Sequence, residues 1–179
     1  GVFFRMIFEE RDILESLSVN YWRKHWKEAI VDGEKCAIGE LSCALRPFSP
    51  KEGAELANQM QRFVHERTRL GIPLIIHDEC LHGCMAKGCT SFPQSIALAS
   101  TWDPDLMSEV STAIGRETRA RGIHQALSPT INIARDPRCG RTEETYGEDP
   151  YLASIMAVSF IEGVQGQKVV TTPKHFAAN

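Results

Sequence analysis

The sequence GIPLIIHDE, residues 71–79, joins a short apolar run directly to a histidine and two carboxylates. The apolar run does not alternate with polar residues, and such a run is typical of a strand buried on both faces of a parallel sheet. The polar residues after it would lie at the carboxyl edge of that sheet, where α/β proteins hold their functional groups. Four such runs are predicted to be strands: Ala37–Leu45, Ile72–Ile76, Ala126–Ile133 and Val169–Thr172.

Helical patterns separate the predicted strands. Ser49-Pro50-Lys51-Glu52 combines a capping serine, a proline at the first helical position and a glutamate at the third. Asp103-Pro104 and Asp149-Pro150 open two further helices in the same way, and an earlier helix is predicted over residues 12–30. The repeated β–α order predicts an α/β fold with a parallel sheet.

The composition excludes several classes of function. The chain has 179 residues, of which 42 % are hydrophobic and 24 % are charged, as in an ordinary globular domain. The net charge of −3 gives no electrostatic support for nucleic-acid binding. No apolar run of about 18 residues occurs and no signal-peptide pattern is seen, so neither a membrane-spanning helix nor a membrane partner is predicted.

A group of cysteines and histidines is a conceivable metal site. Cys80, Cys84 and Cys89 lie close together in the sequence, with His77 and His82 nearby. Their spacings do not follow the paired Cys-x-x-Cys pattern of zinc sites. We therefore predict no metal ion at this position, and buried thiols are the simpler interpretation.

Two more segments carry unusual polar residues. Residues 135–150 hold three arginines and five carboxylates, and Lys174-His175 follows the last predicted strand. A salt-bridged or solvated loop is the ordinary interpretation of such residues. The alternative is a site for vicinal hydroxyl groups, because a guanidinium forms forked hydrogen bonds to neighbouring oxygen atoms.

Taken in order, the motifs are specific. GIPLIIHDE is followed by FPQSIALA at 92–99, TWDP at 101–104, the RDPR loop from residue 135, and TPKHF at 172–176. This series resembles the N-terminal domain of glycoside hydrolase family 3 from about residue 38 to residue 179. The resemblance implies the first half, about four βα units, of a (β/α)8 barrel of the TIM type. We expect a helical segment at 1–35, which matches poorly, and a barrel part at 36–179, truncated after its fourth strand.

The resemblance also implies an activity. Family members hydrolyse terminal non-reducing β-D-glycosyl residues with retention of configuration, and need no cofactor or metal. Retaining enzymes use two carboxyl groups roughly 5–5.5 Å apart. In this family the nucleophile lies on a Ser-Asp-Trp-like segment after a late strand, and the acid/base usually comes from a following domain. Neither segment occurs here, so no residue of this chain is predicted to be catalytic.

By motif position, five residues are expected to bind the sugar of a β-linked oligosaccharide or glycoside. Glu79, with Asp78 beside it, stands where the family has a carboxylate that contacts sugar hydroxyls. Arg141 would contact the same sugar, and Lys174 and His175 match a pair that donates hydrogen bonds to neighbouring hydroxyls. Such hydrogen bonds strengthen in the transition state.

Departures from the family pattern leave alternatives open. Cys139 replaces a tryptophan of most members, and Glu79 replaces an aspartate of many glucosidases. The longer carboxylate would crowd the hydroxymethyl group of glucose, which favours a β-xylosidase, whereas RTEETYG at 141–147 resembles the glucosidase loop. KHFAAN at 174–179 disfavours the β-N-acetylglucosaminidase branch. A non-catalytic α/β sugar-binding module is the second alternative.

Overall fold

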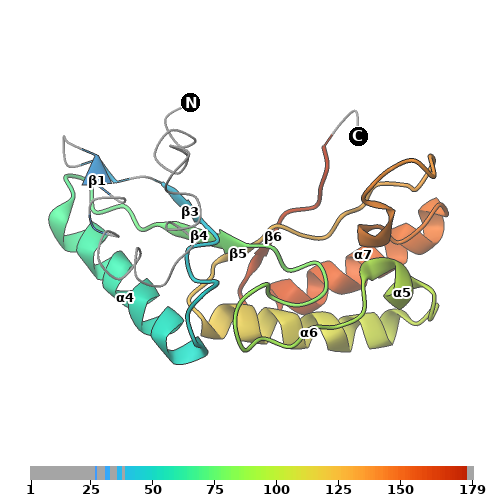
Figure 1. Cartoon of the computed structure of the whole chain (residues 1–179), viewed down its shortest axis with the longest axis horizontal. Helices are drawn as coiled ribbons and strands as arrows, with labels where there is room; N and C mark the ends of the chain where they lie inside the picture. The colour runs from blue at the N-terminus through green and yellow to red at the C-terminus, as the bar shows by residue number, and fades with distance from the viewer. Residues whose placement is uncertain (1–26, 28–30, 33–35, 38, 177–179) are drawn as a thin grey trace.

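The computed structural model describes Lys27, residues 31–32, residues 36–37 and residues 39–176 (Figure 1). Of the predicted helix over residues 12–30, only Lys27 lies among the described residues. The strands are β1 (Val31–Asp32), β2 (Cys36–Ala37), β3 (Glu40–Ser42), β4 (Ile75–Asp78), β5 (Gln125–Ala126) and β6 (Val170–Thr171). The helices are α4 (Pro50–Arg67), α5 (Ser95–Ala99), α6 (Pro104–Ala120), α7 (Pro150–Gln165) and the 3-10 helix η1 (Thr142–Glu144).

The main sheet has four parallel strands in the order β3-β4-β5-β6. The order along the chain therefore equals the order in space, as expected for consecutive strands of a (β/α)8 barrel. The strands are shorter than predicted: of Ala126–Ile133, only Ala126 lies in a strand, and Thr130 forms an isolated bridge to Lys174. A separate antiparallel pair, β1 and β2, was not predicted.

The two faces of the sheet differ, which corrects the prediction that both would be buried. Ile76 and Ala126 are 1 % and 0 % exposed on the face that packs into the hydrophobic core, and Figure 1 shows α6 and α7 on that side. Ile75, next to Ile76 on β4, and Val170 on β6 point to the opposite face, where they are 43 % and 59 % exposed. Among the described residues, nothing packs over this second face closely enough to bury them.

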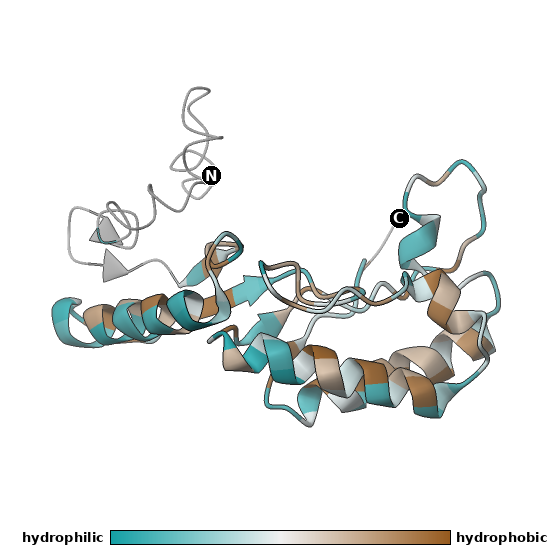
Figure 2. Cartoon of the chain, turned by 60° about the horizontal axis from the view of Figure 1, so that its bottom comes forward, coloured by the Kyte–Doolittle hydropathy of each residue, from teal (hydrophilic) through white to brown (hydrophobic). Residues whose placement is uncertain are grey.

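The helices begin where their caps predict. Ser49 and Glu52 form a complete capping box at α4, with the Ser49 backbone N–H donating to Glu52 Oε2 at 3.1 Å. The Asp103 carboxylate accepts from the Leu106 backbone N–H at 2.9 Å, and Asp149 does the same at the start of α7. Figure 2 shows hydrophobic residues interspersed among hydrophilic ones along α4, as expected for a helix with one buried face. The short helix α5 was not predicted.

Helices α6 and α7 pack together very closely. A Cβ atom placed on Gly163 of α7 would lie 2.0 Å from Ser111 Oγ of α6, so only glycine fits. The same serine hydroxyl donates to the Ser159 carbonyl of α7 at 3.2 Å. After α6, the fully buried Arg121 donates to the carbonyls of Phe48 and Lys87. Arg121 thus ties the end of α6 to the segments that follow β3 and β4.

Candidate substrate-binding site

Glu79 and Lys174 form an ion pair at the carboxyl edge of the sheet. The Lys174 ammonium donates to both carboxylate oxygens of Glu79, at 2.9 and 2.8 Å, and the two side chains remain 13 % and 28 % exposed. Glu79 follows β4 and Lys174 follows β6, so parallel strands bring together residues 95 positions apart. The backbone of Lys174 is held in turn by hydrogen bonds with Pro129 and Ile131, of 3.0 and 2.8 Å.

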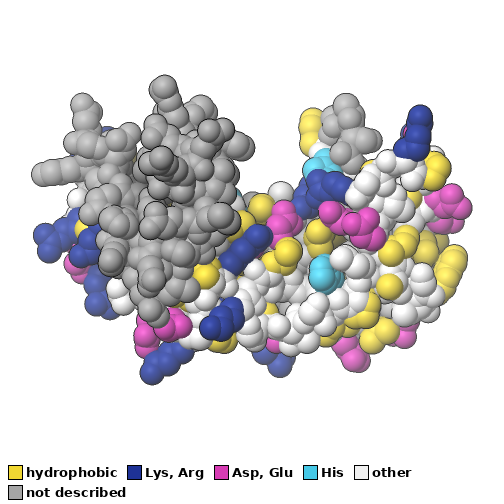
Figure 3. Space-filling model, in the orientation of Figure 1, with side chains coloured by type: hydrophobic (Ala, Val, Ile, Leu, Met, Phe, Trp, Pro, Cys, Tyr) yellow, Lys and Arg dark blue, Asp and Glu magenta, His cyan; other side chains and the backbone are white. Residues whose placement is uncertain are grey.

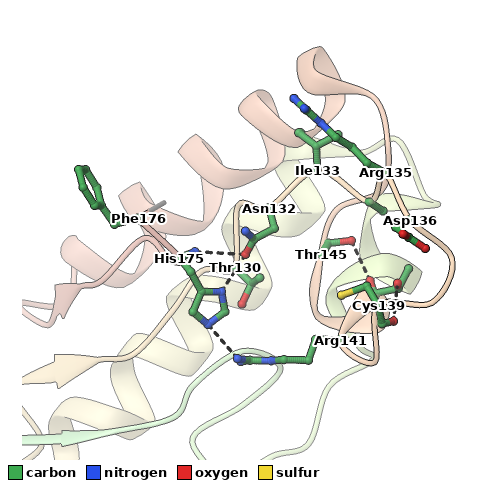
Figure 4. Close-up of a pocket in the computed structure, with 12 residues that line it drawn as sticks. Thr130, Asn132, Ile133, Arg135, Asp136, Cys139, Arg141, Thr145, His175 and Phe176 are labelled. Atoms are coloured by element: carbon green, nitrogen blue, oxygen red, sulfur yellow. Dashed lines mark hydrogen bonds between the residues drawn. The ribbon is translucent and has the colours of Figure 1, made fainter. Parts of the chain in front are cut away.

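Beside this pair lie Arg141 and His175. Arg141 uses two nitrogens to bind Glu144, with Nε to Oε1 at 2.9 Å and Nη2 to Oε2 at 2.6 Å. Its remaining nitrogen, Nη1, lies 2.8 Å from His175 Nε2. On the other side of the imidazole ring, Nδ1 lies 2.9 Å from Asn132 Oδ1, as Figure 4 shows.

The charges of this cluster act on one another. Hydrogen bonds from Arg141 lower the pKa of Glu144, and the same bonds raise the pKa of Arg141. Burial lowers the pKa of His175, and the nearby cations Arg141 and Lys174 lower it further. These shifts favour a charged pair of Arg141 and Glu144 beside a neutral His175 imidazole.

Asp78 lies apart from the other four predicted residues. Its carboxylate is 1 % exposed and faces the helical side, where Oδ1 accepts from Arg46 Nε at 2.7 Å. The same oxygen accepts from the Glu79 backbone N–H at 2.7 Å. Burial raises the pKa of Asp78, although the Arg46 ion pair acts to lower it. In this structure Asp78 holds Arg46 and the Glu79 backbone, and its contact with sugar stays a prediction.

Several members of the cluster were missed in the sequence. Asn132 and Glu144 hold His175 and Arg141, and Arg46 holds Asp78. Asn132 stands out only as an amide within an apolar run, and Glu144 as one of five carboxylates in its loop. Their partners are identified only by contacts across the fold.

A pocket of about 470 Å³ opens next to Arg141 and His175 (Figure 4). Figure 3 shows acidic, basic and histidine side chains of the described residues grouped on the upper side of the molecule, over the ends of the strands. The pocket is lined by Thr130, Asn132, Ile133, Ala134, Arg135, Asp136, Cys139, Arg141, Thr142, Thr145, His175 and Phe176. Hydroxyl, amide and charged groups thus share its wall with apolar side chains, a mixture suited to a polar organic ligand.

The cysteine cluster takes no part in this site. Cys80 and Cys84 are buried, and Arg121 Nε donates to Cys89 Sγ at 3.0 Å. No group of three or more His, Cys, Asp or Glu side chains within the described part of the chain is arranged to hold a metal ion. Among the same residues, no helix has the length and apolar character needed to cross a bilayer.

Residues 12–179 match the family described as "Glycosyl hydrolase family 3 N terminal domain". Because this match covers most of the chain, the protein belongs to glycosyl hydrolase family 3, as the motifs indicated. The match begins within the segment that we expected to be separate, and the division at residue 35 stays a prediction.

Named relatives and solved structures agree with this family. A β-xylosidase of Formosa agariphila is 44 % identical in an alignment of 122 residues, and the match covers 60 % of this chain and 17 % of the relative. The thermostable β-glucosidase B of Acetivibrio thermocellus is 41 % identical over 62 % of this chain and 16 % of its own. A β-glucosidase structure from Erythrobacter marinus matches 91 % of this chain and 22 % of its own, with a TM-score of 0.77 and 36 % identity.

The chain spans about a fifth of the length of these relatives. Its fold class is confirmed: the parallel sheet and its helices correspond to part of the TIM-type barrel of the family's enzymes.

Proposed function

We propose that this chain supplies part of the sugar-binding pocket of a retaining β-glycosidase, which removes terminal non-reducing β-D-glycosyl residues. The observation that carries the proposal is the convergence of Glu79, Lys174, Arg141 and His175 at one edge of the sheet. A carboxylate, an ammonium and a guanidinium at one edge of the sheet offer both acceptors and donors for the hydroxyl groups of a sugar. Family membership supports this interpretation.

The ion pair of Glu79 and Lys174 suits a neutral, polyhydroxylated ligand. Without ligand, each charge compensates the other, and both side chains remain partly exposed. A sugar hydroxyl that enters the pair can donate to the carboxylate and accept from the ammonium, so both charges stay paired. Such hydrogen bonds help catalysis to the extent that they strengthen in the transition state.

The proposal assigns neither the nucleophile nor the acid/base to this chain. Glu79 is held by Lys174, and Glu144 by both nitrogens of the Arg141 fork. The lowered pKa of Glu144 makes it a poor general acid. The two reacting carboxyl groups are therefore assigned to other parts of the full-length enzyme.

The test uses the full-length protein that contains this sequence, with an aryl β-glucoside as substrate. Lys174→Ala should lower kcat/KM roughly 10- to 150-fold, because a hydrogen bond with a charged partner contributes about 1.5–3 kcal/mol. Lys51→Ala is the matched control, since Lys51 is 86 % exposed on α4 and should leave kcat/KM unchanged. Residues 1–179 alone should not turn over the substrate, and saturable hydrolysis by them would contradict the placement of the nucleophile elsewhere. If the full-length protein and residues 1–179 both bind glucose but neither hydrolyses the glycoside, the result would support the alternative of a non-catalytic sugar-binding module.

A β-xylosidase is the second candidate, favoured by Glu79 and by the 44 % identity to the Formosa agariphila β-xylosidase. Crowding by Glu79 predicts that Glu79→Asp raises kcat/KM for an aryl β-glucoside relative to an aryl β-xyloside. A wild-type enzyme that already strongly prefers the glucoside would rule this idea out.

A further inference from the structure

Asn132 makes two contacts with His175, and the sugar-binding role proposed above does not account for them. Its side-chain oxygen, Oδ1, lies 3.1 Å from the His175 backbone nitrogen and 2.9 Å from the ring nitrogen Nδ1. Asn132 comes from the segment after β5, and His175 from the segment after β6, 43 positions later. A single amide thus holds both the main chain and the ring of this histidine.

These contacts determine where the ring proton lies. A backbone N–H can only donate, so the Asn132 atom that meets it must be the amide oxygen. This oxygen can only accept, so Nδ1 of His175 must carry a hydrogen in order to bond to it. At the opposite end of the ring, the guanidinium of Arg141 also can only donate, so Nε2 must present a lone pair. Two independent contacts therefore specify the same neutral tautomer.

We propose that Asn132 is a positioning residue that holds His175 in the neutral Nδ1–H form, so that its Nε2 lone pair accepts hydrogen bonds at the sugar site. The role of Nε2 towards sugar rests on the function proposed above. This reverses the direction expected from the motif, in which His175 donates to a hydroxyl. In the free protein Arg141 Nη1 donates to the Nε2 lone pair. A bound sugar hydroxyl would replace this N–H as the donor, because the nitrogen has one lone pair.

The charged groups around the ring act in opposite directions, and the two cations have the larger effect. Arg141 and Lys174 oppose a positive charge on His175, whereas Glu144 and Glu79 favour one. Protonation would also set an Nε2–H against the N–H of Arg141, two donors facing each other. Together with burial, these effects lower the pKa of His175 and keep the ring neutral at physiological pH.

The first experiment measures ring-nitrogen NMR chemical shifts of isotope-labelled histidine in the full 179-residue chain. Near neutral pH, His175 should show a protonated Nδ1 and an unprotonated Nε2. An Nε2–H tautomer or an imidazolium in the wild-type protein would overturn the proposal without need of any variant.

Two substitutions then test Asn132 itself. Asn132→Asp keeps the acceptor but adds a negative charge, so the His175 pKa should rise by about one pH unit or more. Asn132→Leu removes the acceptor and should allow the Nε2–H tautomer to appear. Asn58→Asp adds the same charge at an exposed position of α4 and should leave His175 unchanged. An unchanged tautomer in Asn132→Leu would mean that Arg141 alone positions the ring.

A kinetic experiment in the full-length glycosidase separates positioning from simple structural support. Asn132→Asp should move the acid limb of the kcat/KM profile to higher pH by the same amount as the His175 pKa. A purely structural role would lower kcat/KM equally at every pH. If the enzyme hydrolyses no glycoside but NMR finds the Nδ1–H form, the proposed function fails and the tautomer assignment stands.

Discussion

Asp78 and Glu79 are adjacent carboxylates with different surroundings. Side chains alternate between faces along a strand, so Asp78 points into the helical layer and Glu79 lies at the open edge. The Asp78 carboxylate accepts a hydrogen bond of 2.7 Å from the backbone N–H of Glu79. The placement of Glu79 therefore depends on the buried Asp78 carboxylate and on its ion pair with Arg46.

At the residue scale, Asp78→Ala should destabilise the chain. The substitution removes the acceptor of Arg46 and of the Glu79 N–H, and hydrogen bonds to a charged group contribute about 1.5–3 kcal/mol. Arg46 remains 32 % exposed and can be hydrated, which limits the loss. The midpoint of urea unfolding provides the measurement.

Asp136→Ala is the matched control, because Asp136 also pairs with an arginine, Arg138, but on the surface. Its removal should leave the urea midpoint unchanged within error. Equal effects of the two substitutions would show that burial of Asp78 contributes nothing to the stability of the chain.

At the scale of elements, the contact between α6 and α7 depends on one glycine. Gly163→Ala would place a Cβ 2.0 Å from Ser111 Oγ and 2.9 Å from the Ser108 carbonyl oxygen. Overpacking of this kind typically costs about 1–3 kcal/mol or more, measured as a lower thermal midpoint. Gly39→Ala, where a Cβ meets nothing within 4 Å, should not lower the midpoint.

A double variant sharpens this test. Ser111→Ala removes the closest clashing atom but leaves the backbone atoms of α6 in place, so it should restore only part of the stability of Gly163→Ala. Full restoration would locate the whole clash in the serine hydroxyl and none of it in the helix backbones.

At the scale of the whole molecule, the exposed face of the sheet predicts association between chains. Ile75 on β4 and Val170 on β6 are exposed on the same face, with β5 between their strands, and apolar groups on a sheet promote contact between molecules. The 179-residue chain should therefore self-associate in sedimentation velocity, and Ile75→Thr should reduce this association without loss of stability. Ile76→Thr, one residue along but 1 % exposed, should instead unfold the chain. A chain that stays monomeric at high concentration would contradict this interpretation.

The sequence predicts best what depends on local contacts. The starts of α4, α6 and α7 follow from their capping residues, whose partners lie three positions away or closer. Strand lengths depend on pairing with distant segments, and Ala126–Ile133 therefore contains far less strand than its apolar residues suggested. The exposure of Ile75 depends on what covers the sheet, which a local pattern does not encode.

The same distinction applies to the candidate site. Family motifs identify Glu79, Arg141, Lys174 and His175 as candidates, but the residues that hold them are specified by tertiary contacts. Asn132 lies 43 positions from His175, and its residue type alone does not indicate which group it will meet. Asp78 was grouped with Glu79 because the two are adjacent, although strand geometry separates their side chains.

The ion pair between Glu79 and Lys174 joins residues 95 positions apart. A piece of the chain that lacks either of these residues cannot form it. The two side chains meet only when β4, β5 and β6 are all in register. A ligand held by both therefore binds only to molecules in which β4, β5 and β6 are assembled, and its binding energy is added to the stability of that assembly. Affinity for sugar would thus disappear as soon as β6 separates from β5, while α4 and its local caps are still intact.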